Sequence, residues 1–235
     1  MHLRKNSLRA AAVAGAVAMA TGAALAVTGT AHAQDQARAG GPAGDRAGRT
    51  AQSLPAFLVP KELPPHPGSD WYASEVTKGL LETAPFCLDK ALPSAGSSHR
   101  TFWTEYDTGA AQLVVRTGSA DAARKLAAAV EKKVRACAAD WERQHPQGTA
   151  AMGVPPMPLR LWGSDYGTLP AEDGAHVYGV HTSYPDSEPG IHLYGIGLDG
   201  RTVTVVKWGQ MGDFAHAPVA DFKHTTTTAV VKLHG

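Results

Sequence analysis

The first 33 residues have the three-part pattern of an export signal, which fixes both the residues left to fold and their redox environment. Residues 1–9 carry three basic side chains and no acid, and residues 10–27 form an uncharged run rich in Ala, Val and Gly. Thr30-Ala31-His32-Ala33 follows, with the small residues at its last and third-last positions that signal peptidase prefers. We therefore predict a signal peptide over 1–33, a mature chain that starts at Gln34, and a secreted, extracellular protein.

The apolar run could instead stay in the membrane as an anchor. It is about 18 residues long, which is at the border for a membrane span. Because it consists mostly of weakly apolar Ala and Gly and precedes a cleavage site, we expect cleavage and no stable membrane anchor afterwards. No cysteine lies near the predicted cut, so we expect no lipid anchor either. The Arg4-Lys5 pair lacks the second arginine of a twin-arginine signal, which favours the general secretory route.

Removal of the signal peptide leaves 202 residues and changes the formal net charge from +1 to −2. A chain this close to neutral offers no polycationic surface, so we expect no nucleic-acid partner. Residues 34–53 contain no large apolar side chain and cannot bury enough surface to offset chain entropy. We expect a disordered linker over 34–53 and a single domain over 54–235, which is long enough to bury one sizeable core.

The clearest predicted element is an amphipathic helix from Ser119 to His145. Apolar or small residues recur there at intervals of three and four, at Ala123, Leu126, Ala127, Val130, Val134, Cys137 and Trp141. The charged residues lie off this stripe. Ser119 suits the N-cap, and Pro146 would stop the helix.

Alternating apolar and polar residues predict six strands around this helix. The strands are expected at Arg100–Tyr106, Ala111–Thr117, Leu159–Tyr166, His176–Tyr184, Ile191–Leu198 and Arg201–Trp208. Asp199-Gly200 predicts a two-residue hairpin turn between the last two strands, because glycine tolerates positive φ. The element order is therefore β-β-α-β-β-β-β-α, since Pro218–Leu233 predicts a closing helix.

Two further segments come before the first predicted strand. Residues 54–67 contain five prolines, which predict an extended segment that lies along the body of the domain. The spacing of Trp71, Val76 and Leu80 predicts a short helix within Trp71–Leu81, although Gly79 weakens it.

Cys87 and Cys137 are the only cysteines in the chain. In an exported protein, two cysteines most often form one bridge, and this one would tie the long helix to the segment after Pro85-Phe86. In the chain-entropy model, a bridge that closes a loop of this length contributes about 4 kcal/mol. The alternative is two free buried thiols. A redox role is disfavoured because the cysteines do not form a Cys-x-x-Cys motif.

No catalytic or metal signature is legible in the sequence. Its 11 histidines include no His-Glu-x-x-His motif and no Cys/His cluster, and we interpret them as scattered surface residues. Gly163-Ser164 lacks the glycine of a nucleophile elbow, and Gly195-x-Gly197 precedes a hairpin turn rather than a helix. The loop acids Glu172, Asp173, Asp186 and Glu188 are expected to be solvated. We therefore predict no catalytic residues, no metal and no cofactor.

The strand faces suggest a candidate binding surface. On one face of the predicted strands the residues are small or aliphatic, with glycines that would let a helix approach closely. The other face carries His and Tyr, which have an apolar body and a polar tip. We expect helices to cover the first face and the second to be open or to line a groove; the alternative is that the aromatic residues pack under the proline-rich segment or a loop. The candidate ligand-binding residues are Tyr178, Thr182, Tyr184, His192, Tyr194 and Trp208.

The order of elements and cysteines resembles that of PknH-like extracytoplasmic sensor domains, which occur on receptor kinases and on exported or lipid-anchored proteins of actinobacteria. The features that carry the resemblance are Cys87 before a hairpin, Ser119-Ala120-Asp121-Ala122-Ala123 opening an Ala-rich helix, Ala136-Cys137, Gly200-Arg201-Thr202-Val203, and a last helix after Pro218. The resemblance covers about Leu54 to Gly235.

This resemblance implies an α+β fold: a twisted antiparallel sheet, here of about six strands, with helices packed on one face and a cleft thought to bind a ligand. The receptor-kinase members carry two disulfides, whereas only Cys87–Cys137 is possible here. We also expect no kinase domain and no membrane anchor in this chain, so direct signalling is not implied.

Three readings of function follow. The first is a secreted, non-catalytic, sensor-like binding domain for a small molecule, a cell-wall fragment or a protein. The second is an interaction protein, such as an inhibitor of a secreted enzyme, that acts through the proline-rich segment or the loop Gln147–Pro158. The third is an unrecognised hydrolase that uses loop carboxylates or histidines. A deep aromatic pocket would favour the first reading, and a flat sheet with a protruding rigid loop the second.

Overall fold

A computed structural model describes residues 57–145, 159–183, 188–212 and 214–234. The predicted signal peptide, the linker over 34–53 and the loop Gln147–Pro158 lie outside the described residues. None of the helices in the described part of the chain has the length and apolar character that a membrane crossing requires.

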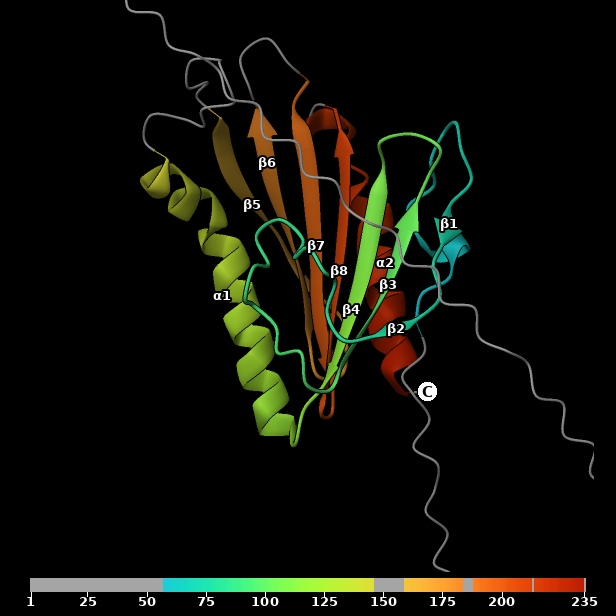
Figure 1. The fold of residues 1–235 in the computed structure, drawn as a ribbon, viewed down its shortest axis with the longest axis vertical. Coiled ribbons are helices and arrows are strands. Elements are labelled where there is room, and N and C mark those ends of the chain that lie inside the picture. The colour runs from blue at the N-terminus through green and yellow to red at the C-terminus, as the bar shows by residue number, and fades with distance from the viewer. Residues whose placement is uncertain (1–56, 146–158, 184–187, 213, 235) are drawn as a thin grey trace, which may run out of the picture. The chain divides into compact units, whose positions relative to one another are not determined.

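The described residues form an eight-stranded antiparallel sheet with two long helices (Figure 1). The strands run along the sheet in the order β1-β3-β4-β8-β7-β6-β5, and β2 also pairs with β3. Their bounds are β1 Tyr72–Ala73, β2 Thr77–Lys78, β3 Ser97–Trp103, β4 Gly109–Arg116, β5 Arg160–Leu169, β6 Ala175–Ser183, β7 Gly190–Asp199 and β8 Thr202–Met211. Helix α1 spans Ala120–Gln144 and α2 spans Val219–Val231; the 3-10 turns are η1 Pro60–Glu62, η2 Phe214–His216 and η3 Lys232–His234.

The α+β class, the antiparallel sheet and the predicted order from β3 to α2 are confirmed. Ser119 caps α1 as predicted, since its side chain accepts a hydrogen bond from the Ala122 backbone N–H at 3.2 Å. Trp71–Leu81 is not a helix; it forms β1 and β2, which pair with β3 and raise the strand number to eight. The β7–β8 hairpin turns one residue later than predicted, at Gly200-Arg201, where Gly200 has φ +52°.

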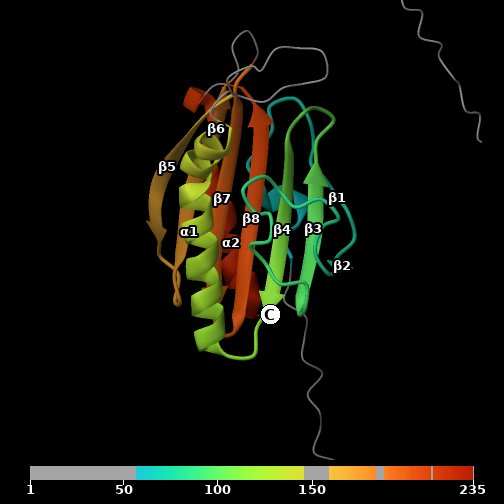
Figure 2. The same ribbon diagram turned by 60° about the vertical axis from the view of Figure 1, so that its left-hand side comes forward.

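The two helices pack on opposite faces of the sheet, whereas the sequence analysis expected both on one face. In Figure 2, α1 lies in front of the sheet and α2 lies behind it. One apolar cluster joins α1 to Tyr194, Ile196 and Val205, and a second joins α2 to residues of the other face, including Leu193 and Val206. Because β6, β7 and β8 bury apolar side chains on both faces, each face needs its own cover.

Helix α2 approaches the sheet closely because two glycines of β7 face it. A Cβ added at Gly195 would overlap the side chain of Thr226, whose own Cβ would lie 2.9 Å away. A Cβ at Gly197 would likewise overlap Val230. The sequence analysis predicted that glycines on this face would admit a helix, and they do. Thr226 tolerates its helical position because its hydroxyl donates to the Phe222 carbonyl at 2.9 Å.

Helix α1 is held to the other face by apolar packing and by the predicted disulfide. Its most buried residues are Ala123, Ala127, Val130, Val134 and Ala138. Cys137 is bonded to Cys87, with a Cα–Cα distance of 5.6 Å and a sequence separation of 50 residues. The bond fixes the segment around Phe86 between α1 and the sheet. In the chain-entropy model, a disulfide that closes a loop of this size adds about 4 kcal/mol to the free energy of unfolding.

The close approach of α2 predicts the effect of adding one methyl group to β7. Gly195→Ala should lower the free energy of unfolding by about 1–3 kcal/mol, because the methyl group must displace Thr226. Gly163→Ala in β5 is the matched control: its added Cβ meets nothing nearer than the Gly179 carbonyl oxygen at 3.9 Å, and it should change stability by less than about 0.5 kcal/mol. Urea unfolding of the two variants tests this, and equal stabilities would contradict the packing of α2.

Candidate functional site

The His/Tyr face that the sequence analysis expected to be open is covered by α1. Tyr178 is 2% exposed and donates its hydroxyl hydrogen bond to Glu131 of α1 at 3.0 Å. Tyr194 is fully buried and donates to the Phe86 carbonyl at 2.7 Å. Burial raises the pKa of both hydroxyls, with Glu131 adding to the rise at Tyr178. The open-face hypothesis is therefore wrong for these two residues, which are structural.

The other predicted site residues are divided between two places. Trp208 lies on the α2 face, is 2% exposed and belongs to the apolar cluster under α2. Thr182 and His192 are half-buried on the α1 face, where both line a small pocket beyond the cover of the helix. Tyr184 lies outside the described residues.

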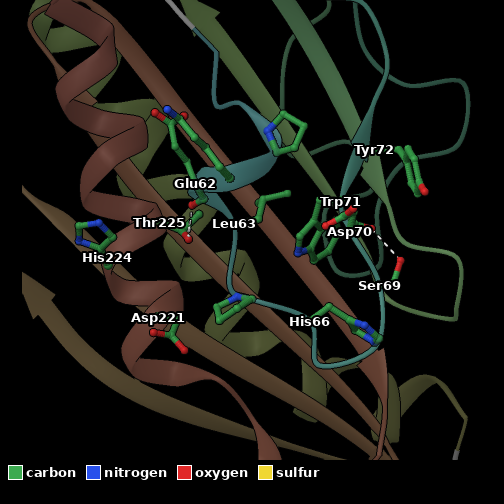
Figure 3. A pocket seen from close by; sticks show the side chains of 13 residues that line it. Glu62, Leu63, His66, Ser69, Asp70, Trp71, Tyr72, Asp221, His224 and Thr225 are labelled. Atoms are coloured by element: carbon green, nitrogen blue, oxygen red, sulfur yellow. Dashed lines mark hydrogen bonds between the residues drawn. The ribbon is translucent and has the colours of Figure 1, made fainter.

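A cleft with a volume of about 790 Å³ lies between the proline-rich segment and α2 (Figure 3). The proline-rich segment supplies most of its walls, and α2 supplies the opposite side. The lining residues are Pro60, Lys61, Glu62, Leu63, Pro65, His66, Ser69, Asp70, Trp71, Tyr72, Asp221, His224 and Thr225.

Glu62 fixes the proline-rich segment against the C-terminal end of the fold. Its carboxylate accepts hydrogen bonds from the Val59 backbone N–H at 2.8 Å and from Lys232 Nζ at 2.6 Å. Its backbone carbonyl accepts the Thr225 hydroxyl of α2 at 2.7 Å. Lys232 also donates to the Phe57 carbonyl at 3.0 Å. Because the prolines restrict φ and these bonds fix both ends, this wall of the cleft is preorganised.

The cleft combines a buried apolar wall with a polar rim. Trp71 is 9% exposed and donates its indole N–H to the Pro64 carbonyl at 2.8 Å, which holds the ring beside Leu63. Asp221 and His224 stand on the α2 side of the opening, and His66 and Asp70 on the other (Figure 3). Neither Asp70 nor Asp221 forms an ion pair with another described residue.

Two stacked pairs of aromatic rings, which we call the aromatic patch, begin at the cleft: His66 and Tyr72 line it, and each stacks on a ring outside it. The members of the aromatic patch are His66, Tyr72, Trp103 and Tyr106. The Tyr72 and Trp103 rings stack with centroids 6.3 Å apart, and those of His66 and Tyr106 with centroids 5.4 Å apart. Tyr72, Trp103 and Tyr106 are 41%, 46% and 62% exposed, so their ring faces are available to a ligand.

The cleft shows no arrangement for covalent catalysis. Its Ser69 and Thr225 hydroxyls donate to backbone carbonyls, and in the described residues neither is hydrogen-bonded to a histidine. No group of three or more His, Cys, Asp or Glu side chains within the described ranges is arranged to hold a metal ion. What the cleft offers is hydrogen-bonding groups and ring faces around an apolar wall, which suits binding.

Sequence reasoning missed this cleft. It placed the proline-rich segment along the body of the domain, and Leu58 and Leu63 are indeed buried there. It did not identify α2 as the neighbour of that segment, because the Thr225–Glu62 contact joins residues 163 positions apart. One local signal was present in β3, where neighbouring side chains point to opposite faces: Phe102 is buried and Trp103 is exposed.

Comparison with known proteins gives a similarity at the level of the fold alone. No family model matches the sequence, and no curated protein matches it either. Among solved structures, the extracellular domain of PknH from Mycobacterium tuberculosis is similar over 74% of this chain and 100% of that chain, with 12% identity and a TM-score of 0.39. We transfer no function or binding residue from that domain to this chain.

One buried and one half-buried histidine predict that the protein loses stability in acid. Burial lowers the pKa of His181 to about 4 and that of His192 to about 3, with nearby Lys207 contributing to the latter. His181 is 1% exposed, so the expectation of surface histidines is wrong for this residue. In the unfolded chain both rings have a pKa of about 6.5. Below that pH the unfolded state therefore binds more protons than the folded state.

The free energy of unfolding should therefore fall by about 2–4 kcal/mol between pH 7 and pH 5, as expected for two such groups. Urea unfolding at pH 5, 6 and 7 measures this change. His192→Gln should make the dependence shallower, because it removes one of the two groups. Equal stability at pH 5 and pH 7 would show that the rings are protonated in the folded state.

Proposed function

We propose that this protein is an exported, non-catalytic, sensor-like ligand-binding domain, and that its ligand site is the cleft between the proline-rich segment and α2 together with the aromatic patch. The observation that carries the proposal is a preorganised cleft of about 790 Å³ in which the lining residues His66 and Tyr72 each stack on a further exposed ring, Tyr106 and Trp103. The bridge between Cys87 and Cys137 supports export, since structural disulfides persist in oxidising compartments.

The charges of the cleft favour a neutral or cationic ligand over an anionic one. Glu62, Asp70 and Asp221 line it together with one lysine, Lys61. The charge of Glu62 is already compensated by Lys232, which leaves Asp70 and Asp221, against Lys61 alone, to act on a ligand. An anion would meet two uncompensated carboxylates, whereas an ammonium or hydroxyl group would find acceptors.

The aromatic patch favours a ligand with an apolar face and polar edges. Exposed Trp and Tyr rings offer a flat surface at low entropic cost, and their polar tips stay hydrated. A saccharide of the cell wall has this character, and its amino-sugar or peptide amine could reach the carboxylates of the cleft. We therefore name cell-wall saccharide fragments as the ligand class. A protein that docks on the same aromatic patch is the second candidate.

Calorimetric titration with soluble cell-wall saccharide fragments tests the proposal. Trp103→Ala should weaken binding at least about tenfold, equivalent to about 1.4 kcal/mol. Trp162→Ala is its matched control, because Trp162 is similarly exposed, at 41%, but lies on β5 at the other end of the sheet. Asp221→Asn, in the first turn of α2, should weaken the binding of amine-bearing fragments, and Asp121→Asn, in the first turn of α1, should not.

Failure of every fragment to bind, or binding that survives both Trp103→Ala and Asp221→Asn, would reject the cleft as the ligand site. Capture of a purified secreted protein that requires Trp103 would favour the second candidate. Cleavage of a fragment during the titration, seen by mass spectrometry, would overturn the non-catalytic assignment.

A further inference from the structure

A second pocket lies on the α1 face, at the end of the sheet where β6 ends and β7 begins. Its volume is about 410 Å³, and it is lined by the polar residues Asp107, Thr182, Glu188, His192, Lys207 and Gln210, with Gly109, Gly190, Gly209 and Met211. It contains none of the residues that line the cleft, and it lies on the opposite face of the sheet from α2. The pocket is therefore a cavity separate from the cleft.

Lys207 is a half-buried cation without a counter-ion in this pocket. It projects from the inner strand β8, where its cross-strand neighbours on the two sides are Ala111 and Tyr194. Within the described ranges, no carboxylate forms an ion pair with Lys207. Burial lowers its pKa to about 8, so near neutral pH the ammonium form still predominates. An uncompensated, partly buried charge lowers the stability of the fold, and an anion bound beside it would offset that cost.

Two glycines make room for the polar side chains of this pocket to lie against the sheet. A Cβ at Gly209 would collide with Lys207 Nζ and lie 3.0 Å from His192 Nδ1, so both nitrogens lie over the same glycine. A Cβ at Gly190 would lie 2.5 Å from Thr182 Oγ1 and 3.7 Å from His192 Nε2. The missing side chains thus let an ammonium, an imidazole and a hydroxyl lie directly over the sheet.

His192 contributes a second unused polar atom. Its Nδ1 is buried and has no hydrogen-bond partner among the described residues. The ring is held against Phe86, with centroids 5.0 Å apart, so the nitrogen is fixed in position. Burial and nearby Lys207 lower the pKa of the ring, so it is neutral beside the ammonium group and does not add a second positive charge.

We propose that this pocket binds the carboxylate group of a small organic monoanion, which Lys207 Nζ holds as its counter-ion. A single cation balances one negative charge. A phosphate dianion would bring a second negative charge toward the rim, where Asp107 and Glu188 stand.

Titration of the purified protein with acetate, propionate and benzoate, followed by NMR, tests this site. The amide signals of Gly190 and Gly209 should shift and saturate, and the pKa of Lys207, read from its side-chain signals, should rise on binding. Acetamide, propionamide and benzamide have the same shapes without the charge and should have no effect. Inorganic phosphate should bind more weakly than the carboxylates.

Lys207→Met keeps the length of the side chain and removes its charge, and it should weaken carboxylate binding at least tenfold. Lys132→Met, at an exposed position on α1, should leave binding unchanged. A stable, folded Lys207→Met variant that binds as tightly as the parent overturns the proposal. Equal responses to the amides, or saturable shifts with none of the three carboxylates, also overturn it, and tighter binding of phosphate rejects the monoanion class. None of these outcomes bears on the cleft, for which Asp221→Asn is a separate control.

Discussion

Strands β7 and β8 carry large apolar side chains on both faces, so neither face of the sheet centre can be left to solvent. Tyr194 and Ile196 alternate with Leu193 along β7, and Val205 is followed by Val206 in β8. One helix covers each face, and each attachment has its own local cause. On one face, β7 glycines admit α2, and on the other a disulfide and an alanine-rich stripe hold α1.

This double cover determines where ligands can bind. The middle of each sheet face is occupied by a helix, and therefore the cavities open beside the helices. The cleft lies between α2 and the proline-rich segment, and the Lys207 pocket lies near the β6–β7 connection on the α1 face. Neither cavity is marked by a sequence motif, because its shape depends on residues that restrict or free the backbone. Prolines form one wall of the cleft, and glycines lie beneath the side chains of the pocket.

The sequence was sufficient for the elements whose signals are local. The α1 stripe, the Ser119 cap and the β3 to β8 alternation depend on spacing within a segment, and the structure bears them out. The disulfide was predictable for another reason, since an exported chain with only two cysteines has one possible bridge. Sequence reasoning failed for features that depend on contacts between segments far apart in the sequence. Tyr178 looks amphipathic in its strand, yet its hydroxyl is satisfied by Glu131, 47 residues earlier, and the ring is buried. Neither cavity was predicted, because both join segments far apart in the sequence.

The central claim is that α1 and α2 cover the two faces of one strand pair independently, and hydrogen exchange before and after reduction of the disulfide measures this most directly. We predict the slowest amide exchange in β7 and β8. Reduction of Cys87–Cys137 should accelerate exchange in α1 and around Phe86 and leave α2 protected, because the bond acts on one face alone. Simultaneous loss of protection in both helices would contradict the account.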